Sequence, residues 1–406
     1  MTPDVVRPAR RRRRFVALAL TAVAVTLLAT FVLLEGLARW LWELPPAMAE
    51  FGQAGLYVQT PSGGTGLVPG YRGTLKLLLD APDIRVEVNA LGMRGPEVGA
   101  KQPGERRVLV VGDSVVFGYG VASAETFVAG LEAQLRRPER PVVVGNGGVS
   151  GFNSHEAARR LGDLRPGFAP DLVVFTVFLG NDAFENRNHD FFVAGGLRFT
   201  GPWAVLMRDS LRARLATRSR FLLWCETWLV TNAPQHSLVS RIVMSPEALA
   251  LREGFPGVPP VWAETHAGLF CDVIDERTGW PAGAPAVVPR VQDDFRQALL
   301  AARAAAAGLP LLVLVLPTWW HVDADAHRQR LAELKFDPAA FRRGLAQERL
   351  LALCTELGLP MLDATPWLEA EADRRGQFLP DGGHLTVAGH AVVAARLVAA
   401  VEAAWR

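Results

Sequence analysis

The sequence predicts an α/β fold of three layers, in which a parallel β-sheet lies between two layers of helices. The first observation is that, from residue 106 onward, short apolar segments alternate with longer segments of helical spacing. Such alternation is typical of parallel strands joined by crossover helices, which cover both faces of the sheet. The second observation is that the apolar segments contain almost no polar residues, as expected for strands buried on both faces.

The N-terminal segment predicts a basic tail followed by a transmembrane helix. Residues 1–14 contain six arginines and one aspartate, whereas the whole chain has a net charge of +2. Residues 15–34 contain no charged side chain, and a helix of that length spans the hydrocarbon core of a bilayer, which is about 30 Å thick. Trp40 and Trp42 follow, as is typical of a membrane interface. Because basic flanks stay in the cytoplasm, we expect a single-pass protein of the inner membrane with a periplasmic or extracytoplasmic body.

Cleavage of this segment is the competing interpretation, because signal peptides also begin with basic residues and an apolar stretch. Their apolar cores are shorter than residues 15–34, so a retained anchor is favoured. Without the basic tail, the rest of the chain carries a small net negative charge. This charge argues against a surface that binds nucleic acid.

The segments after the anchor predict a linker and a small β extension. Residues 35–70 are rich in proline, glycine and small polar residues, which is typical of a juxtamembrane linker. Residues 71–105 are expected to form a small β extension before the main sheet. Within it, residues 74–77 and 84–88 alternate in the way expected of a β-hairpin.

Residues 106–404 predict the α/β domain itself, interrupted by a long insertion. The predicted strands are 107–112, 141–146, 171–179, 310–316 and 360–364. The predicted helices are 125–137, 153–164, 291–307, 338–357 and 386–404. Residues 183–290 break the alternation, with a helical pattern over 203–230 and a loop-like composition over 253–290. A lid over the site and a peripheral decoration are equally compatible with this insertion.

The three cysteines are too few for a disulfide framework. Cys225 and Cys271 both lie in the insertion and could pair in an oxidising compartment. Cys354 is expected to be a buried small hydrophobe. No cysteine–histidine spacing fits structural zinc, and neither Gly-x-Gly-x-x-Gly nor a Walker A loop is present. We therefore expect no metal and no organic cofactor.

Four motifs at the ends of predicted strands or before the last helix carry the residue types that acyl transfer needs. They are Gly112-Asp113-Ser114, Asn146 to Gly151, Gly180-Asn181-Asp182 and Asp381-Gly382-Gly383-His384. Because ligands bind at the carboxyl ends of parallel strands, we expect the motifs to converge at one edge of the sheet. Acyl transfer requires a nucleophile, a base, a carboxylate that orients the base, and donors for the oxyanion.

This set of motifs resembles the SGNH hydrolase family of GDSL-type esterases and lipases, in its bacterial membrane-anchored form. The resemblance implies a flavodoxin-like three-layer fold with Ser114 as nucleophile, His384 as base and Asp381 as the orienting carboxylate. It also implies an oxyanion hole made of the Ser114 N–H, the Gly151 N–H and the Asn181 side-chain amide. It covers residues 106–182 and 291–404, and the insertion departs from the family pattern.

From these residues we expect a serine esterase that hydrolyses O-acyl esters, with carbohydrate esters among its candidate substrates. The resemblance also implies an alternative, an O-acyltransferase that acts on cell-envelope polysaccharide with the same triad. Both activities use every motif named above, so the sequence does not separate them. A catalytically silent binding or scaffold domain that kept the fold is a third interpretation.

Two further features lie close to the predicted site. Trp319 and Trp320 follow the strand 310–316 and could stack on sugar rings, although aromatic side chains are more often core or interface. His321 and His327 are separated by aspartates at a spacing that fits no metal site. A solvated helix start is therefore the simpler interpretation of this segment.

Overall fold

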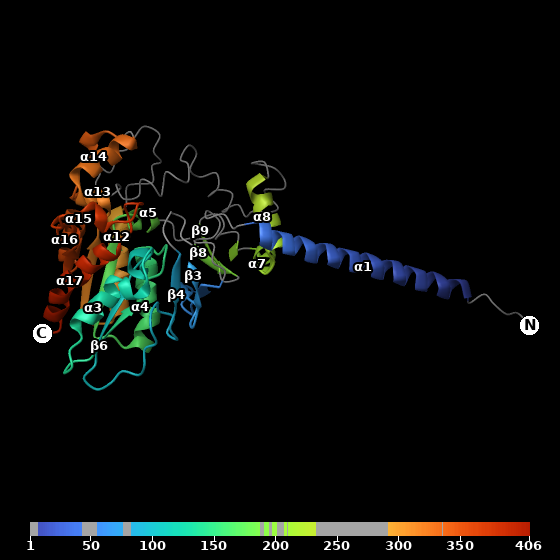
Figure 1. The fold of residues 1–406 in the computed structure, drawn as a ribbon, viewed down its shortest axis with the longest axis horizontal. Coiled ribbons are helices and arrows are strands. Elements are labelled where there is room, and N and C mark those ends of the chain that lie inside the picture. The colour runs from blue at the N-terminus through green and yellow to red at the C-terminus, as the bar shows by residue number, and fades with distance from the viewer. Residues whose placement is uncertain are drawn as a thin grey trace, which may run out of the picture.

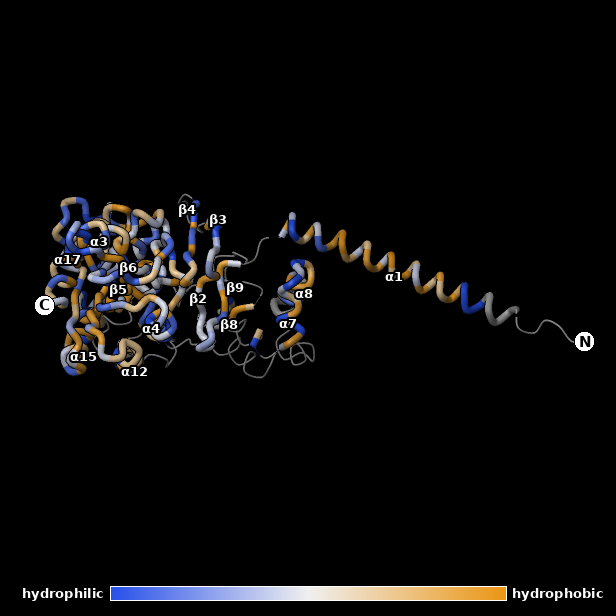
Figure 2. Tube along the Cα trace, turned by 90° about the horizontal axis from the view of Figure 1, so that it is seen from below, coloured by the Kyte–Doolittle hydropathy of each residue, from blue (hydrophilic) through white to orange (hydrophobic). Residues whose placement is uncertain are grey.

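A long N-terminal helix extends away from an α/β body in the computed structural model of this chain (Figure 1). The helix is α1 (Arg7–Leu41), and its colour in Figure 2 shows a hydrophobic stretch after a hydrophilic start. The structure describes residues 7–42, 55–75, 83–186, 191–194, 197–200, 207–208, 210–232, 291–334 and 336–406.

A five-stranded parallel sheet forms the centre of the body. Its strands are β5 (Arg106–Val111), β6 (Val142–Asn146), β7 (Leu172–Phe178), β10 (Leu311–Leu316) and β11 (Met361–Asp363). They lie in the order β11-β10-β7-β5-β6, and every neighbouring pair is parallel. Numbered along the chain, this order is 2-1-3-4-5, the order of flavodoxin-like folds. The predicted fold class is confirmed, and each strand lies within two residues of its predicted bounds.

Each face of the sheet is covered by helices that bury one of the two alternating sets of strand side chains. The helices α3 (Phe127–Leu135) and α17 (Val387–Ala404) pack together over one face, where Val108 and Val110 point. The helices α4 (Ser154–Phe168), α12 (Val291–Ala306) and α15 (Leu345–Glu356) cover the other face. Every residue of β7 and β10 is buried, which explains why these strands have no polar face in the sequence.

Side-chain caps define the starts of several helices. Thr386 accepts a hydrogen bond from the backbone N–H of Gly389, so α17 begins where the sequence predicts. The helix α4 continues to Phe168 although it was predicted to end at residue 164. Burial of the Phe168 side chain and a hydrogen bond from Arg107 Nη1 to the Phe168 carbonyl, at 2.9 Å, hold this last turn despite the proline within it.

A buried histidine connects α17 to α3 and gives a prediction on stability. His390 Nδ1 accepts a hydrogen bond from the Phe127 N–H at 3.1 Å, and the two rings stack. Burial, followed by the charges of Arg94 and His384, lowers the pKa of His390 to about 3. The unfolded chain then binds one more proton than the folded chain from about pH 6.5 down to about pH 3. Stability is therefore complete above this window and falls as the pH decreases through it.

We expect His390→Asn, which keeps an acceptor for the Phe127 N–H, to remove this contribution. The melting temperature of the wild-type chain should fall more steeply between pH 6.5 and pH 4 than that of the variant. Thermal unfolding followed by circular dichroism over this range measures the difference. Parallel curves for the two proteins would contradict the prediction, because all other titrating groups are common to both.

The segment before the main sheet differs from its prediction. A linker was predicted over residues 35–70, but α1 continues to Leu41 and two strands lie within the remainder. The strands β1 (Tyr57–Gln59) and β2 (Thr65–Leu67) pair antiparallel, and Tyr57 and Leu67 are buried. Several glycines of this segment, Gly55, Gly63 and Gly70, lie in turns or bends beside the short strands, which contributes to the linker-like composition.

The predicted hairpin and the buried cysteine are observed. The strands β3 (Arg72–Leu75) and β4 (Ile84–Glu87) pair antiparallel as predicted, while residues 76–82 lie outside the described residues. Cys354 is fully buried in the core, as predicted. Cys225 is a free cysteine in the structure, and Cys271 lies outside the described residues.

The insertion is described only in part. It contributes the strands β8 (Phe191–Ala194) and β9 (Leu197–Thr200) and the helices α7 (Leu211–Ala216) and α8 (Arg220–Asn232). The helix α7 lies within the predicted helical segment 203–230, and α8 begins within it and ends two residues beyond it. The loop-like segment predicted over 253–290 lies outside the described residues.

Two described helices are long and apolar enough to cross a membrane. An 18-residue window within Arg12–Leu41 of α1 has a mean hydropathy of 2.5, and no residue of that window is buried. The second helix is α17, whose Val393, Leu397 and Val401 are completely buried against the sheet. Because α17 packs in the core, α1 is the candidate membrane span.

Candidate active site

Ser114 lies at the carboxyl end of the central strand β5, where the chain turns into a short helix. The helix α2 (Ser114–Phe117) begins at Ser114, and Asp113 caps it by accepting a hydrogen bond from the Val115 N–H at 3.0 Å. A Cβ atom on Gly112 would lie 1.8 Å from Thr176 Oγ1, so this position accepts only glycine. Strand order places the turn at the switch point between β5 and its two neighbours, where such folds bind ligands.

A buried arginine fixes the turn that carries Ser114. Arg94 Nη1 donates to the carbonyl oxygens of Phe117 and Gly118 at 2.6 and 2.7 Å, and Arg94 Nη2 donates to that of Val121 at 2.8 Å. These bonds hold the carbonyls at the end of α2 and in the turn that follows it. Arg94 is not predicted from the sequence, because nothing around an isolated arginine indicates which distant carbonyls it contacts.

The structure joins the three predicted triad residues in one chain of hydrogen bonds. Ser114 Oγ lies 2.8 Å from His384 Nε2, and His384 Nδ1 lies 2.5 Å from Asp381 Oδ2. The other carboxylate oxygen, Asp381 Oδ1, accepts from the N–H groups of Gly383 and His384 at 3.0 and 3.1 Å. The aspartate thus orders its own loop with one oxygen and orients the imidazole with the other.

The surroundings of Asp381 and Asp113 shift their pKa values in opposite directions. Burial tends to raise the pKa of Asp381, but the hydrogen bond and charge of His384 and two backbone N–H groups lower it below its ordinary value. Burial raises the pKa of Asp113 to about 6, although the charge of His384 and backbone N–H groups oppose this. The lowered pKa of Asp381 keeps its carboxylate ionised beside the imidazole at neutral pH.

Aromatic side chains hold the His384 ring from two sides. The Tyr119 ring lies 4.4 Å from it and the Phe178 ring 6.3 Å, measured between centroids. The loop is also tied to the end of β10, since the Trp319 N–H donates to the Gly382 carbonyl at 2.7 Å. The sequence did not indicate Tyr119 or Phe178 as parts of the site, although both stand within five residues of its motifs.

The segment after β10 forms two helices that were not predicted in full, α13 (Trp319–Val322) and α14 (Ala324–Glu333). Asp323 caps α14, in agreement with the helix start that the sequence favours at this point. His321 is fully buried and its Nδ1 lies 2.6 Å from Thr318 Oγ1, so this histidine packs within the fold. Among the described residues, no group of three or more histidine, cysteine, aspartate or glutamate side chains could hold a metal.

Gly151 and Asn181, the two remaining predicted donors, follow β6 and β7, the strands on either side of β5. Gly151 has a positive φ of 71°, and its carbonyl accepts from Arg198 Nη2 at 2.6 Å. Asn181 Nδ2 donates to Glu185 Oε2 at 2.9 Å, which occupies one of the two amide hydrogens. Strand order brings both residues to the edge where Ser114 lies, but no hydrogen bond between described residues joins either of them to Ser114.

Asp182, the residue after Asn181, connects two elements of the fold by hydrogen bonds. Its Oδ2 accepts from the Phe178 N–H at 2.9 Å and from Ser154 Oγ at 3.0 Å, which connects the end of β7 to the start of α4. Burial and then the charge of Asp113 raise its pKa well above the ordinary value. Glu185 is half-buried, and desolvation and the neighbouring acids raise its pKa well above the ordinary value.

The predicted role of Asn181 as a donor in the oxyanion hole can be tested by substitution. We expect Asn181→Ala to lower kcat for ester hydrolysis by roughly 10²–10³-fold with little change in KM, because the donor acts mainly on the transition state. The matched control is Glu185→Gln, whose amide oxygen can still accept from Asn181 Nδ2. Steady-state kinetics on a chromogenic ester compare the variants. An Asn181→Ala enzyme as fast as the wild type would remove Asn181 from the oxyanion hole.

Comparison with known proteins gives similarity in structure only. No family model matches the chain, and no curated protein matches it. Among solved structures, TesA is 14% identical, with a TM-score of 0.36 over 74% of this chain and 99% of that one. A lipase/acylhydrolase from Enterococcus faecalis is 11% identical, with a TM-score of 0.35 over 73% and 96%. A two-domain esterase active on acetylated mannans is 11% identical, with a TM-score of 0.36 over 74% of this chain and 50% of that one.

Proposed function

We propose that this chain is a membrane-anchored serine esterase of the SGNH hydrolase family that hydrolyses O-acyl esters. The observation that carries the proposal is the chain of hydrogen bonds from Ser114 Oγ through His384 to Asp381. Nucleophile, base and orienting carboxylate stand in the order and at the distances that nucleophilic acyl transfer requires. The family is inferred from the four sequence motifs, and the flavodoxin-like strand order agrees with the fold expected of that family.

The geometry supports a two-step mechanism. Ser114 Oγ attacks the ester carbonyl carbon while its proton passes to His384 Nε2, and Asp381 stabilises the imidazolium that forms. The N–H groups of Ser114 and Gly151 and the amide of Asn181 bind the oxyanion. His384 then gives its proton to the departing alkoxide, which leaves an acyl-serine. Water, deprotonated by His384, attacks this acyl group, releases the acid and restores the Ser114 hydroxyl.

We place the esterase at the outer face of the inner membrane. The apolar residues 15–34 lie within α1, and the arginines before them favour a cytoplasmic N-terminus. The body would then face the periplasm or exterior, where O-acylated carbohydrates of the cell envelope are candidate substrates. Protease treatment of spheroplasts tests this topology, since only a body on the outside is degraded while the membrane stays intact. The mass of the mature N-terminus tests whether the anchor is retained.

An O-acyltransferase is the second candidate, because an acceptor alcohol in place of water completes the same two steps. The intact hydrogen-bond chain from Ser114 to Asp381 favours either enzyme over a silent scaffold domain. Supplying the acyl-enzyme with polysaccharide and measuring the ratio of free acid to acylated product separates hydrolase from transferase.

The decisive experiment traps the nucleophile. The full chain, solubilised in detergent, is incubated with p-nitrophenyl acetate and butyrate and then with an alkyl phosphonate ester that modifies activated serines. We expect release of p-nitrophenol, its loss after phosphonate treatment, and a phosphonyl mass increase confined to the peptide with Ser114. Hydrolysis that survives modification of Ser114, or no modification of Ser114 in a folded chain, would contradict the proposal.

A further inference from the structure

The helices α7 and α8 lie at the end of the body from which α1 leaves, in both views of the molecule (Figures 1 and 2). Glu35 of α1 binds the start of α8. Its carboxylate accepts from Ser219 Oγ at 2.6 Å and from the N–H groups of Arg220 and Phe221 at 3.0 Å each. The Phe31 and Phe221 rings meet edge to face at 6.1 Å. The end of α1 is thus fixed to α8 by a helix cap and a ring contact.

These contacts set the depth of α8 relative to a membrane that α1 crosses. Glu35 is the first charged residue after the apolar segment 15–34, and it is the residue that caps α8. A carboxylate that ends an apolar span lies at the boundary between hydrocarbon and headgroups. The first turn of α8 must therefore lie at the same boundary.

The two helices expose apolar side chains in a group. Five large ones on α7 and α8 are between 40% and 64% exposed: Leu211, Leu215, Leu222, Trp224 and Trp228. Outside α1, α7 and α8, the described residues expose only three large apolar side chains to a comparable extent, and these lie on different elements: Val58, Leu351 and Val387. Single exposed apolar residues are normal on a soluble surface, whereas five on two adjacent short helices indicate an interaction surface.

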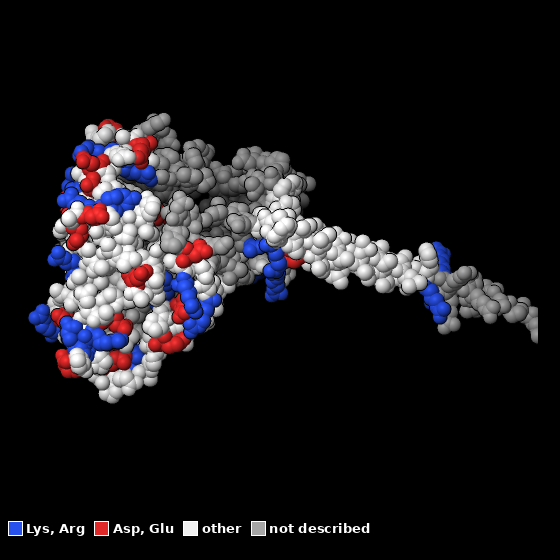
Figure 3. All heavy atoms as spheres, viewed as in Figure 1, with Lys and Arg blue, Asp and Glu red and all other residues white. Residues whose placement is uncertain are grey.

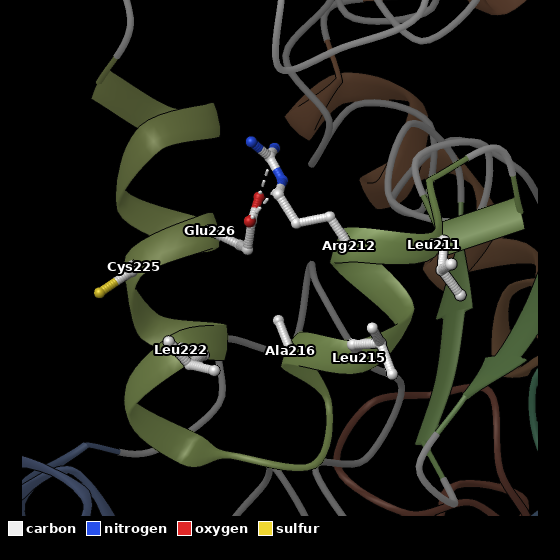
Figure 4. A pocket seen from close by; sticks show the side chains of 7 residues that line it. All are labelled: Leu211, Arg212, Leu215, Ala216, Leu222, Cys225 and Glu226. Carbon is white, nitrogen blue, oxygen red and sulfur yellow. Dashed lines mark hydrogen bonds and ion pairs between the residues drawn. The ribbon is translucent and has the colours of Figure 1, made fainter. Parts of the chain in front are cut away.

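The three leucines Leu211, Leu215 and Leu222 line a hollow of about 490 Å³ between α7 and α8. Figure 4 shows the ion pair of Arg212 and Glu226 above the hollow, with Leu215, Ala216 and Leu222 below it. Arg212 Nε lies 2.9 Å from Glu226 Oε1, so the acid nearest the hollow is neutralised. The lining is thus apolar and carries no free negative charge.

Exposed basic side chains lie on the same segment as these apolar residues. Arg212, Arg214 and Arg218 are exposed on and after α7, and Figure 3 shows basic atoms beside the base of α1. The segment 210–232 contains four arginines and one acid, Glu226, which is paired. Leucine and tryptophan beside arginine are typical of helices that lie in a membrane interface and contact anionic headgroups.

We propose that α7 and α8 lie in the interfacial layer of the membrane crossed by α1, with their leucines and tryptophans at the headgroup–acyl boundary and their arginines on anionic lipid phosphates. The proposal rests on the membrane anchoring proposed above. Part of the insertion would then contact the bilayer, because the end of the membrane-spanning helix α1 is bound to the start of α8. The body would then be held in one orientation on the membrane, since a single span alone permits rotation and tilt.

The test measures the depth of one residue in the full chain. A nitroxide is attached to Leu215→Cys in a background where Cys225, Cys271 and Cys354 are replaced by alanine, and the protein is reconstituted into vesicles of phosphatidylethanolamine and phosphatidylglycerol. The matched control is Leu351→Cys on α15, whose side chain is 51% exposed against 47% for Leu215. Power-saturation electron paramagnetic resonance compares access of oxygen, which enters the bilayer, with access of a water-soluble nickel chelate.

We expect the oxygen-to-nickel ratio to be several-fold higher at position 215 than at position 351. Equal ratios would place α7 in water and overturn the proposal. Exclusion of both reagents from position 215 would also overturn it, because it indicates a protein contact such as a second copy of the chain. Retained ester hydrolysis shows that each labelled chain is folded. Failure of the anchor itself is distinguished by carbonate extraction, which releases a chain that does not span the vesicle membrane.

The headgroup contacts are tested by charge. Replacing Arg214 and Arg218 by glutamine in the labelled Leu215→Cys chain should lower the oxygen-to-nickel ratio. In a second arm, the labelled chain that keeps both arginines is reconstituted into vesicles of phosphatidylcholine alone, and the ratio should again be lower than in anionic vesicles. No change in either arm would remove the anionic lipid from the proposal. Both arginines lie outside the catalytic residues proposed above, so ester hydrolysis should be unchanged in detergent.

Discussion

Ser114→Ala is expected to lower kcat/KM for ester hydrolysis by roughly 10⁴-fold or more, the scale of removing a triad nucleophile. The alanine keeps the backbone of α2, so oxyanion donors and substrate contacts remain while the covalent step is lost. Ser114 is 4% exposed, and among the described residues its Oγ forms a hydrogen bond only with His384, so removal of the hydroxyl leaves no other group without its partner. The change should therefore act on chemistry and hardly on folding. Initial rates with p-nitrophenyl esters measure it.

Ser150→Ala is the matched control for this experiment. Ser150 is also a buried serine at the same edge of the sheet, and its hydroxyl has no hydrogen-bond partner among the described residues. Its removal should leave the rate of hydrolysis near that of the wild type. If both variants were equally active, the hydrolysis would come from a group other than Ser114. Circular dichroism of both variants establishes that they are folded.

The convergence of the site residues could be predicted from the sequence more fully than the contacts and elements that lie between them, for a physical reason. Strands buried on both faces are recognisable as short apolar runs, and parallel strands bring their carboxyl ends to one edge whatever lies between them. Ser114 and His384 are separated by 270 positions and still meet at 2.8 Å, because each stands at a strand end or a loop on that edge. Residue type and place in the strand pattern were therefore sufficient to predict that these side chains converge, whereas their catalytic roles come from the family resemblance and stay a proposal.

The parts that the sequence did not indicate depend on contacts between distant side chains. Nothing in the sequence distinguishes Arg94 from other arginines, because the carbonyls that it contacts after Ser114 come close to it only in the folded chain. The partner of Glu35 is 184 positions away at Ser219, and no periodicity of either helix indicates the pairing. The predicted linker failed for a different reason, since glycine-rich composition is shared by flexible chain and by tight turns between short strands.

Asp381→Asn is expected to lower kcat by roughly 10⁴-fold, although it changes one atom of the side chain. Asparagine Oδ1 can still accept from the N–H groups of Gly383 and His384, so the loop keeps its shape. The amide nitrogen now faces His384 Nδ1 and donates to it, which places the remaining ring proton on Nε2. That proton points at Ser114 Oγ, 2.8 Å away, so the imidazole cannot accept the serine proton.

Asp363→Asn is the matched control for Asp381→Asn. Asp363 also stands at the carboxyl end of a strand and also accepts a backbone N–H, from Thr365 at 2.9 Å, but no histidine contacts it in the described structure. Its variant should hydrolyse esters at the wild-type rate. Pre-steady-state release of p-nitrophenol then shows which step Asp381 serves: a slowed burst with unchanged substrate affinity places the loss in the attack by Ser114. A fast burst followed by slow turnover would restrict Asp381 to deacylation, and a wild-type rate would exclude it from the mechanism.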